Sequence, residues 1–426
     1  MTTRAARSPR PTRTPATTGD LLTPKQLDNY ADVMIWALRD ARAATGDGAV
    51  YSPGDIIMLQ YQPSAGSLAE RIYARLLDAG FHVKLQPMPH FVMDKIFYDH
   101  AQGGQLDLLM PGTKELYGRI NGRIVLTAPD SLTHLAGCDP AKMARSSLAA
   151  KPLQKIVDRR EAAGLYGWTL CMLPTAALAA QAQLTLPEYA AEIVKACYLD
   201  QPDPIAKWRD TMAKIGQVKD WLTSLPIEHV HVQSEDGETD LKVWLGEKRR
   251  WLGGSGHNIP SFEVFTSPEA GRAEGRFHAN EASFKLGRYV RGVRLEFAGG
   301  RVVKATAEAE EEFVRSRVNL DKGSCLIGEF SLTDRRFSEI TRFMASTLFD
   351  ENVGGRNGNT HIAIGRAYTD AYAGPEKMTP ALAKKLKFSD SSEHWDLVAT
   401  TPRVVTAHLR GGGTKVIYRD GQFTCF

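Results

Sequence analysis

The sequence has few cysteines and none of the pairs that hold disulfides or zinc. Its five cysteines are odd in number and widely spaced, and no two form a C-x-x-C motif. Disulfide frameworks and thiolate zinc sites depend on closely spaced pairs, so the pattern disfavours both. We therefore expect reduced, buried thiols in a cytoplasmic protein.

Long apolar runs and a secretory signal are also missing. No apolar segment approaches the roughly 18 residues that a membrane helix needs, and the N-terminus has no apolar core of the kind found in secretory signals. The first residues are instead rich in Arg, Thr, Pro and Ala, a composition typical of disorder. We predict a disordered tail over residues 1–20 and no membrane partner.

The chain also lacks a strong net charge and any nucleotide motif. The net charge is +4, and Arg4, Arg7, Arg10 and Arg13 of the tail account for much of it. The rest of the chain is close to neutral, which gives no reason to expect nucleic acid as a partner. Neither G-x-G-x-x-G nor a Walker sequence occurs, so a nucleotide-binding function lacks support.

The first half of the sequence indicates an α/β domain. A chain of 426 residues exceeds what one hydrophobic core usually serves. Residues 56–61 have the pattern of a buried strand, residues 68–79 that of a helix ending at Gly80, and residues 81–85 that of a second strand. This order predicts a parallel sheet. We expect a doubly wound α/β domain over residues 21–225.

The pattern changes near Pro226. Strand-like segments dominate from there on, and Ala298-Gly299-Gly300 lies between two of them as a clear hairpin signal. We expect residues 226–426 to form a sheet-rich α+β domain that binds metal and carries out catalysis.

Polar side chains interrupt several of these apolar strand patterns. His394 and Asp396 are two residues apart, so in a strand both side chains project to one face. Glu329 lies among apolar neighbours, where a buried carboxylate is costly unless it meets a metal or a cation. Glu263 and His361 have similar surroundings. These residue types are the ligands that a water-activating divalent metal prefers.

Each of these residues also has an ordinary explanation. H-x-D pairs arise often by chance, isolated carboxylates usually lie on a solvated strand face, and a half-buried Tyr368 would be common packing. Together, however, the six side chains exceed what a single catalytic zinc requires. Two ions that share a bridging carboxylate would use such a set. Its oxygen-rich chemistry suits Zn²⁺, Co²⁺, Mn²⁺ or Mg²⁺.

Five segments contain these residues in a specific order. They are Asn258-Ile259-Pro260-x-x-Glu263-Val264-Phe265-Thr266-x-Pro268, Gly328-Glu329, Leu348-Phe349-Asp350-Glu351-Asn352, His361-Ile362-Ala363-Ile364-Gly365-Arg366-Ala367-Tyr368 and His394-x-Asp396. In order and approximate spacing they resemble the thermophilic metallo-aminopeptidases of the aminopeptidase T and aminopeptidase S type. Weaker similarity extends upstream, so the resemblance covers nearly all of the chain after the tail.

The resemblance implies a homodimeric enzyme with two divalent metal ions per chain, which releases N-terminal residues from peptides with a free N-terminus. The implied metal ligands are Glu263, Glu329, His361, Tyr368, His394 and Asp396. The expected mechanism is attack of a metal-activated hydroxide on the first peptide carbonyl. Glu329 would bridge the ions or accept the proton from water, proton transfer by Glu263 is equally open, and Tyr368 is the third predicted catalytic residue.

One segment departs from the family pattern. The segment of residues 353–360, which leads to His361, is longer and richer in glycine than the usual connection in the family. The stretch from Glu329 to Asp350 is slightly shorter than usual. Glycine there predicts a mobile loop beside the site. The resemblance therefore predicts the ligands but no substrate preference for this chain.

Two other functions are compatible with the sequence. A ring-cleaving dioxygenase on the same scaffold would hold one iron through His361, His394 and Asp396, but it would not need both Glu263 and Glu329. A non-catalytic, peptide-binding relative could also have kept the fold. Retention of all six predicted ligands favours the aminopeptidase over both alternatives.

Overall fold

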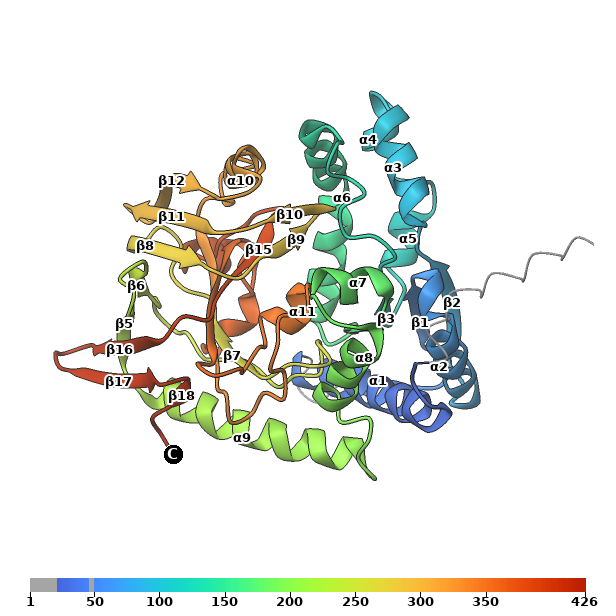
Figure 1. The fold of residues 1–426 in the computed structure, drawn as a ribbon, viewed down its shortest axis with the longest axis horizontal. Helices are drawn as coiled ribbons and strands as arrows, with labels where there is room; N and C mark the ends of the chain where they lie inside the picture. Colours follow the sequence, from blue (N-terminus) through green and yellow to red (C-terminus); the bar gives the residue numbers. More distant parts are fainter. Residues whose placement is uncertain (1–20, 46–49) are drawn as a thin grey trace, which may run out of the picture.

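The computed structural model describes residues 21–45 and 50–426, and the predicted tail over residues 1–20 lies outside them. Along the described chain, a parallel α/β layer is followed by a part built mainly from antiparallel sheets, as the change from blue to red in Figure 1 shows. The predicted combination of a parallel α/β part and a sheet-rich part is confirmed.

The parallel sheet has the strand order β2-β1-β3-β4. Its strands are β1 (Ile56–Tyr61), β2 (His82–Pro87), β3 (Gly122–Thr127) and β4 (Gly167–Met172). The helical elements of this part are α1 (Pro24–Thr45), η2 (Pro63–Ala65), α2 (Gly66–Asp78), α3 (Phe91–His100), α4 (Gly104–Asp107), α5 (Thr113–Tyr117), α6 (Pro140–Glu161), α7 (Ala176–Gln181), α8 (Leu186–Ala196) and α9 (Pro204–Ser224). Among the described residues, no helix is long and apolar enough to cross a membrane.

Helix α9 connects the two parts of the molecule (Figure 1). Asp203 caps its N-terminus directly before Pro204, a favourable start for a helix. Trp208 near this end packs in the core of the parallel part, whereas Ile215 and Leu222 pack in the core of the antiparallel part. Burial of apolar side chains at both ends stabilises the position of α9 against both cores.

The larger antiparallel sheet has the order β12-β11-β8-β6-β5-β16-β17-β18. Its strands are β5 (Ile227–Ser234), β6 (Asp240–Trp244), β8 (Ala273–Ala279), β11 (Val293–Ala298), β12 (Arg301–Thr306), β16 (Arg403–Leu409), β17 (Thr414–Arg419) and β18 (Gln422–Phe423). The hairpin predicted at Ala298-Gly299-Gly300 joins β11 to β12. A short pair, β9 (Ser283–Lys285) and β10 (Arg288–Val290), stands apart.

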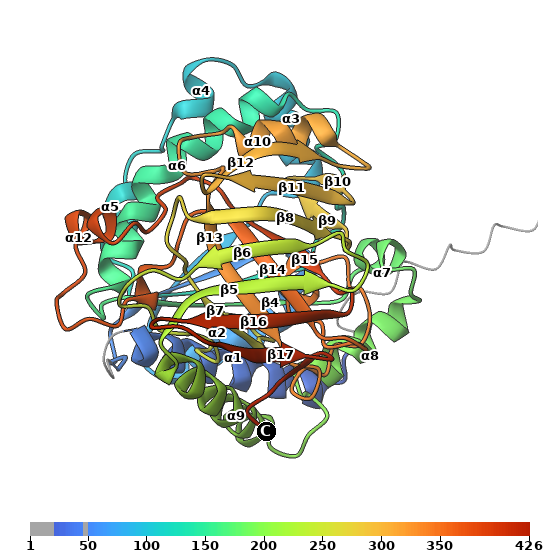
Figure 2. The same ribbon diagram turned by 90° about the vertical axis from the view of Figure 1, so that its left-hand side faces the viewer.

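The smaller antiparallel sheet has the order β15-β14-β13-β7. Its strands are β7 (Glu263–Thr266), β13 (Ile327–Thr333), β14 (Asn359–Gly365) and β15 (His394–Ala399), and the remaining helical elements are α10 (Glu311–Val318), α11 (Thr347–Asp350), η3 (Thr369–Ala371) and α12 (Pro380–Lys385). Figure 2 shows its strands crossing behind those of the larger sheet. Apolar side chains of both sheets form one core.

The predicted domain boundary at residue 226 stays a prediction. Strand β5 begins at Ile227, but Phe262 and Phe349, which lie far beyond it, pack in the core of the parallel part. The chain after residue 226 therefore contributes to both cores.

Candidate metal centre

The register of the smaller sheet brings five predicted ligands to one of its faces. Glu329 of β13 pairs with Ala363 of β14, which pairs with Asp396 of β15. Residues paired across neighbouring strands lie on the same face, as do residues two apart in one strand. His361 is two residues from Ala363, and His394 is two residues from Asp396. The alternation of each strand and the pairing between strands therefore assemble the cluster.

Glu263 reaches the same face from the first residue of β7, where it pairs with Thr333 at the end of β13. Within the cluster, the Glu263 Oε2 atom lies 3.3 Å from Nε2 of His361 and accepts a hydrogen bond of 3.1 Å from the Ser331 hydroxyl. Ser331 itself pairs with His361. A polar partner from the central strand thus orients this buried carboxylate.

Glu329 lies between two groups of potential ligand atoms. One group contains Glu263, Glu329 and His361, and the other contains Glu329, His394 and Asp396, with the ligand atoms of each group within 4.8 Å of one another. Oε1 of Glu329 is 3.2 Å from Nε2 of His361, and Oε2 is 3.5 Å from Nε2 of His394. The two carboxylate oxygens therefore face different groups, as expected of a carboxylate that bridges two cations.

Backbone contacts fix the orientation of the second imidazole. The Nδ1 atom of His394 lies 2.8 Å from the carbonyl oxygen of Arg366, to which it donates a hydrogen bond. This hydrogen bond leaves Nε2 free to face Asp396 at 3.3 Å and the Tyr368 hydroxyl at 3.5 Å. Metal-binding histidines are commonly oriented in this way by a backbone carbonyl.

The cluster has a strong preference for positive charge. Burial lowers the pKa of His394, but Asp396 and Glu329 outweigh this effect and raise it to about 10. Burial likewise opposes protonation of His361, whose contacts with Glu263 and Glu329 nevertheless raise its pKa well above the usual value. Three carboxylates in a buried space require cations nearby. The donor set therefore fits divalent metal ions.

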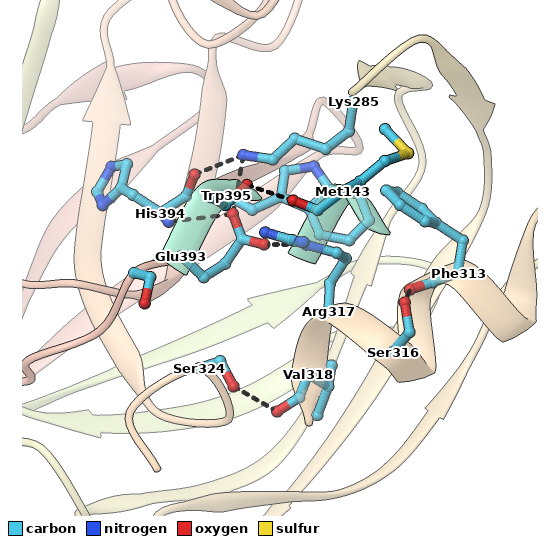
Figure 3. A network of polar contacts seen from close by, with 12 residues as sticks. Met143, Lys285, Phe313, Ser316, Arg317, Val318, Ser324, Glu393, His394 and Trp395 are labelled. Carbon is cyan, nitrogen blue, oxygen red and sulfur yellow. Dashed lines mark hydrogen bonds and ion pairs between the residues drawn. The ribbon is translucent and has the colours of Figure 1, made fainter. Parts of the chain in front are cut away.

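A second layer of charged residues holds the start of β15. Figure 3 shows Glu393 between Lys285 and Arg317, directly beside His394. The Lys285 ammonium lies 3.0 Å from Oε1 of Glu393 and donates a hydrogen bond of 2.7 Å to the carbonyl oxygen of His394. The backbone N–H of His394 in turn donates to Oε1 of Glu393 at 3.1 Å. Both backbone groups of this predicted ligand are thus fixed by charged neighbours.

The cluster opens into one large cavity of about 1420 Å³. Glu263, Glu329, Tyr368, His394 and Asp396 line it, together with residues of α6, β4 and α9 from the preceding half of the chain. The cavity is therefore bounded by both parts of the molecule and has room for a peptide.

Glu351 is a site residue that the sequence analysis did not single out. Its side chain lines the cavity, and Nδ2 of Asn258 donates to its Oε1 at 3.2 Å. Burial raises its pKa well above the usual range, with a further contribution from Asp396. The sequence feature that could have identified Glu351 was its place in one of the five segments, between Asp350 and Asn352. Both of these neighbours are buried in the structure.

The glycine-rich segment that was predicted to be a mobile loop beside the site does not line the cavity. None of residues 353–360, all of which the structure describes, lines the cavity. Asn359 and Thr360 already belong to β14, and Gly358 donates a backbone hydrogen bond of 2.7 Å to Gly354. A Cβ atom on Gly358 would lie 2.0 Å from the hydroxyl of Tyr418. Glycine is required there by close packing.

Comparison with known proteins agrees with this geometry. The model of the thermophilic metalloprotease (M29) family matches residues 23–423. The chain belongs to this metalloprotease family. It is 28% identical to aminopeptidase AmpS of Bacillus subtilis, in a match that covers 54% of this chain and 58% of that relative. It is 29% identical to aminopeptidase T of Thermus thermophilus, in a match that covers 68% of this chain and 73% of that relative. The match to AmpS thus spans less than two thirds of that relative.

The fold of this metalloprotease is similar to the solved structure of wild-type AmpT from Thermus thermophilus. The TM-score is 0.73 at 21% identity, and the match covers 93% of this chain and 99% of the other. The predicted fold class and family are thereby confirmed. The comparisons give no support to the ring-cleaving dioxygenase alternative.

Proposed function

We propose that this metalloprotease is an aminopeptidase that hydrolyses the N-terminal peptide bond of peptides with a free N-terminus. The observation that carries the proposal is the position of Glu329 in two ligand groups on the wall of a cavity large enough for a peptide. Relatives named aminopeptidases support this choice among peptidase activities.

We infer that each chain binds two divalent ions, with Zn²⁺, Co²⁺, Mn²⁺ or Mg²⁺ as the chemically suited choices. Glu263 and His361 would hold one ion, His394 and Asp396 the other, and Glu329 would bridge them. Tyr368 would complete the second group, because its hydroxyl lies 3.5 Å from Nε2 of His394. When bound, such ions supply an activated water and polarise the substrate carbonyl.

The residues of the chain would orient the substrate and transfer protons. Burial raises the pKa of Glu263, which brings this carboxylate closer to the range useful for a general base. Burial also raises the pKa of Tyr368 well above its usual value, so its hydroxyl stays protonated. A protonated hydroxyl in this position would donate a hydrogen bond to the carbonyl oxygen as negative charge develops on it.

The test compares one peptide in two forms, with a free N-terminus and with an N-acetylated one. We expect release of the first amino acid from the free form only, loss of release in chelator, and recovery when Zn²⁺ or Co²⁺ is added. Full activity in excess chelator would contradict the proposal, as would equal cleavage of the acetylated peptide.

We further propose that the protein is a homodimer whose interface includes α3. Every side chain of this helix is at least partly exposed, and its apolar residues include Met93 and Phe97, which are 63% and 39% exposed. Strand β2, an edge of the parallel sheet, precedes this helix. Contiguous exposed apolar side chains usually mark an interaction surface.

We also propose a cytoplasmic location, which the state of the cysteines supports. All five are free, and four of them are buried. Proteins of oxidising compartments commonly use cysteine in disulfides, whereas reduced thiols are typical of the cytoplasm.

A further inference from the structure

Two cations on the cavity wall donate hydrogen bonds to backbone carbonyl groups. Lys219 projects from α9, and Arg250 lies in the segment that leads to β7; both line the cavity. The Lys219 ammonium donates to the carbonyl oxygen of Gly253 at 2.9 Å, and Nε of Arg250 donates to the backbone carbonyl of Asp370 at 2.8 Å. Within the described residues, neither cation forms an ion pair with a carboxylate.

The charged surroundings of Lys219 explain why an anion would bind there. Burial is the largest influence and lowers the pKa of Lys219, the nearby Asp220 raises it, and Arg250 lowers it further. Asp370 lies close to Arg250 on the same wall. The positive charge of Arg250 thus disfavours the charged form of Lys219, and a bound anion would offset this unfavourable interaction.

Backbone amides point to the same kind of ligand. The N–H groups of Gly253, Gly254 and Ser255 find no acceptor in residues 21–45 or 50–426, and these three residues line the cavity. Gly253 and Gly254 have φ angles of +138° and +63°. Backbone amides without an acceptor are donors that a bound anion, such as the carboxylate at the end of a peptide, can satisfy.

The loop formed by residues 253–255 contacts both Lys219 and the strand that carries Glu263. A Cβ atom built on Gly253 would lie 2.2 Å from the carbonyl oxygen of Glu263, so the two backbones are in direct contact. Lys219 is hydrogen-bonded to that same glycine. In an extended tripeptide, the C-terminal carboxylate lies about 7 Å beyond the first carbonyl. The metal centre, the loop and both cations line the same cavity, so a short peptide bound at the centre has both of its ends within that cavity.

We propose that Lys219, Arg250 and the amides of Gly253 and Gly254 bind the C-terminal carboxylate of short peptides. The substrate class is then short peptides with both termini free. This inference rests on the proposed aminopeptidase activity and deepens it, because it assigns a second anchoring point to the substrate.

The experiment measures kcat/KM for one tripeptide as the free acid and as its C-terminal amide. Wild type should prefer the free acid by about tenfold, the size expected for charge-assisted hydrogen bonds to one carboxylate. Lys219→Met and Arg250→Gln should each lower this ratio towards one. Lys384→Met is the matched control, since Lys384 lines the same cavity from α12 and should leave the ratio unchanged.

The ratio is measured within each variant, so a change in overall activity does not affect it. If one variant does not fold by circular dichroism, the other still decides the outcome. Equal rates for acid and amide in wild type would overturn the carboxylate site and leave the aminopeptidase proposal intact. Failure of wild type to release an amino acid from either peptide would overturn both.

Discussion

Among single residues, Glu329 has the greatest influence on the proposed site. It is 4% exposed, and its two oxygens face different imidazoles. A buried carboxylate is costly unless cations compensate it. In the proposed site, Glu329 would thus contribute to function at a cost in stability.

Glu329→Gln should abolish binding of the metal pair while the fold persists. The amide removes the charge that both ligand groups share, so we expect kcat to fall by more than about 100-fold, since even indirect partners of a metal contribute 10- to 100-fold. Elemental analysis and kinetics check this. Glu339→Gln, a substitution of a partly exposed glutamate, is the control. A variant with two ions and full activity would show that Glu329 is no ligand.

Asp370 should make the stability of the protein depend on pH. Burial raises its pKa from 3.8 to about 6, so the folded state binds a proton more tightly than the unfolded state. Protonation of Asp370 therefore stabilises the folded state at acidic pH by at most about 3 kcal/mol. This contribution is lost as the pH rises through about 6. Asp370→Asn should be more stable than wild type at pH 7, with a smaller difference at pH 4. Chemical denaturation at both pH values measures this, and equal differences would contradict it.

At the scale of elements, the start of β15 determines where His394 and Asp396 lie. Gly365 of β14 has a φ of +108°, and a Cβ atom there would lie 2.2 Å from the carbonyl oxygen of Glu393. This close approach and the contacts of Lys285 in Figure 3 hold the strand. Precise placement of ligands depends on such supporting contacts.

Lys285→Met should weaken metal binding although Lys285 is not in the predicted ligand set. Loss of its hydrogen bond to the carbonyl of His394 frees the start of β15, and we expect metal affinity to fall by about tenfold or more. Competition titration with a chromophoric chelator measures the affinity. Lys304→Met removes an exposed lysine from β12 and should have no effect. Unchanged affinity in the Lys285 variant would exclude a supporting role.

The sequence predicts elements better than it predicts their pairing. The two-residue spacing of His394 and Asp396 predicted a shared strand face, and the apolar neighbours of Glu329 predicted a buried strand. The register that brings Glu263 to the same face depends on contacts between distant segments, which local periodicity does not contain. The same limit applies to Lys219 and Arg250, because tertiary packing alone brings them to one wall. The glycines of residues 353–360 led to a prediction of mobility, but close packing also favours glycine, as Gly358 shows.

At the scale of the whole molecule, the exposed apolar face of α3 predicts self-association. Phe97→Glu should weaken the dimer by at least about tenfold, since a buried carboxylate without a partner is strongly unfavourable. Sedimentation velocity over a range of concentrations measures this. Leu165→Glu introduces the same charge at another exposed apolar residue and should leave the dimer intact. A wild-type protein that is monomeric throughout would contradict the proposed dimer.

In the proposed mechanism, two divalent ions bridged by Glu329 would carry out the hydrolysis. The most direct measurement is metal identity and stoichiometry by elemental analysis of the purified, active protein. The predicted result is two divalent ions per chain, whose removal by chelator abolishes release of the N-terminal amino acid. A single iron per chain, or full activity with no bound metal, would rule out this mechanism.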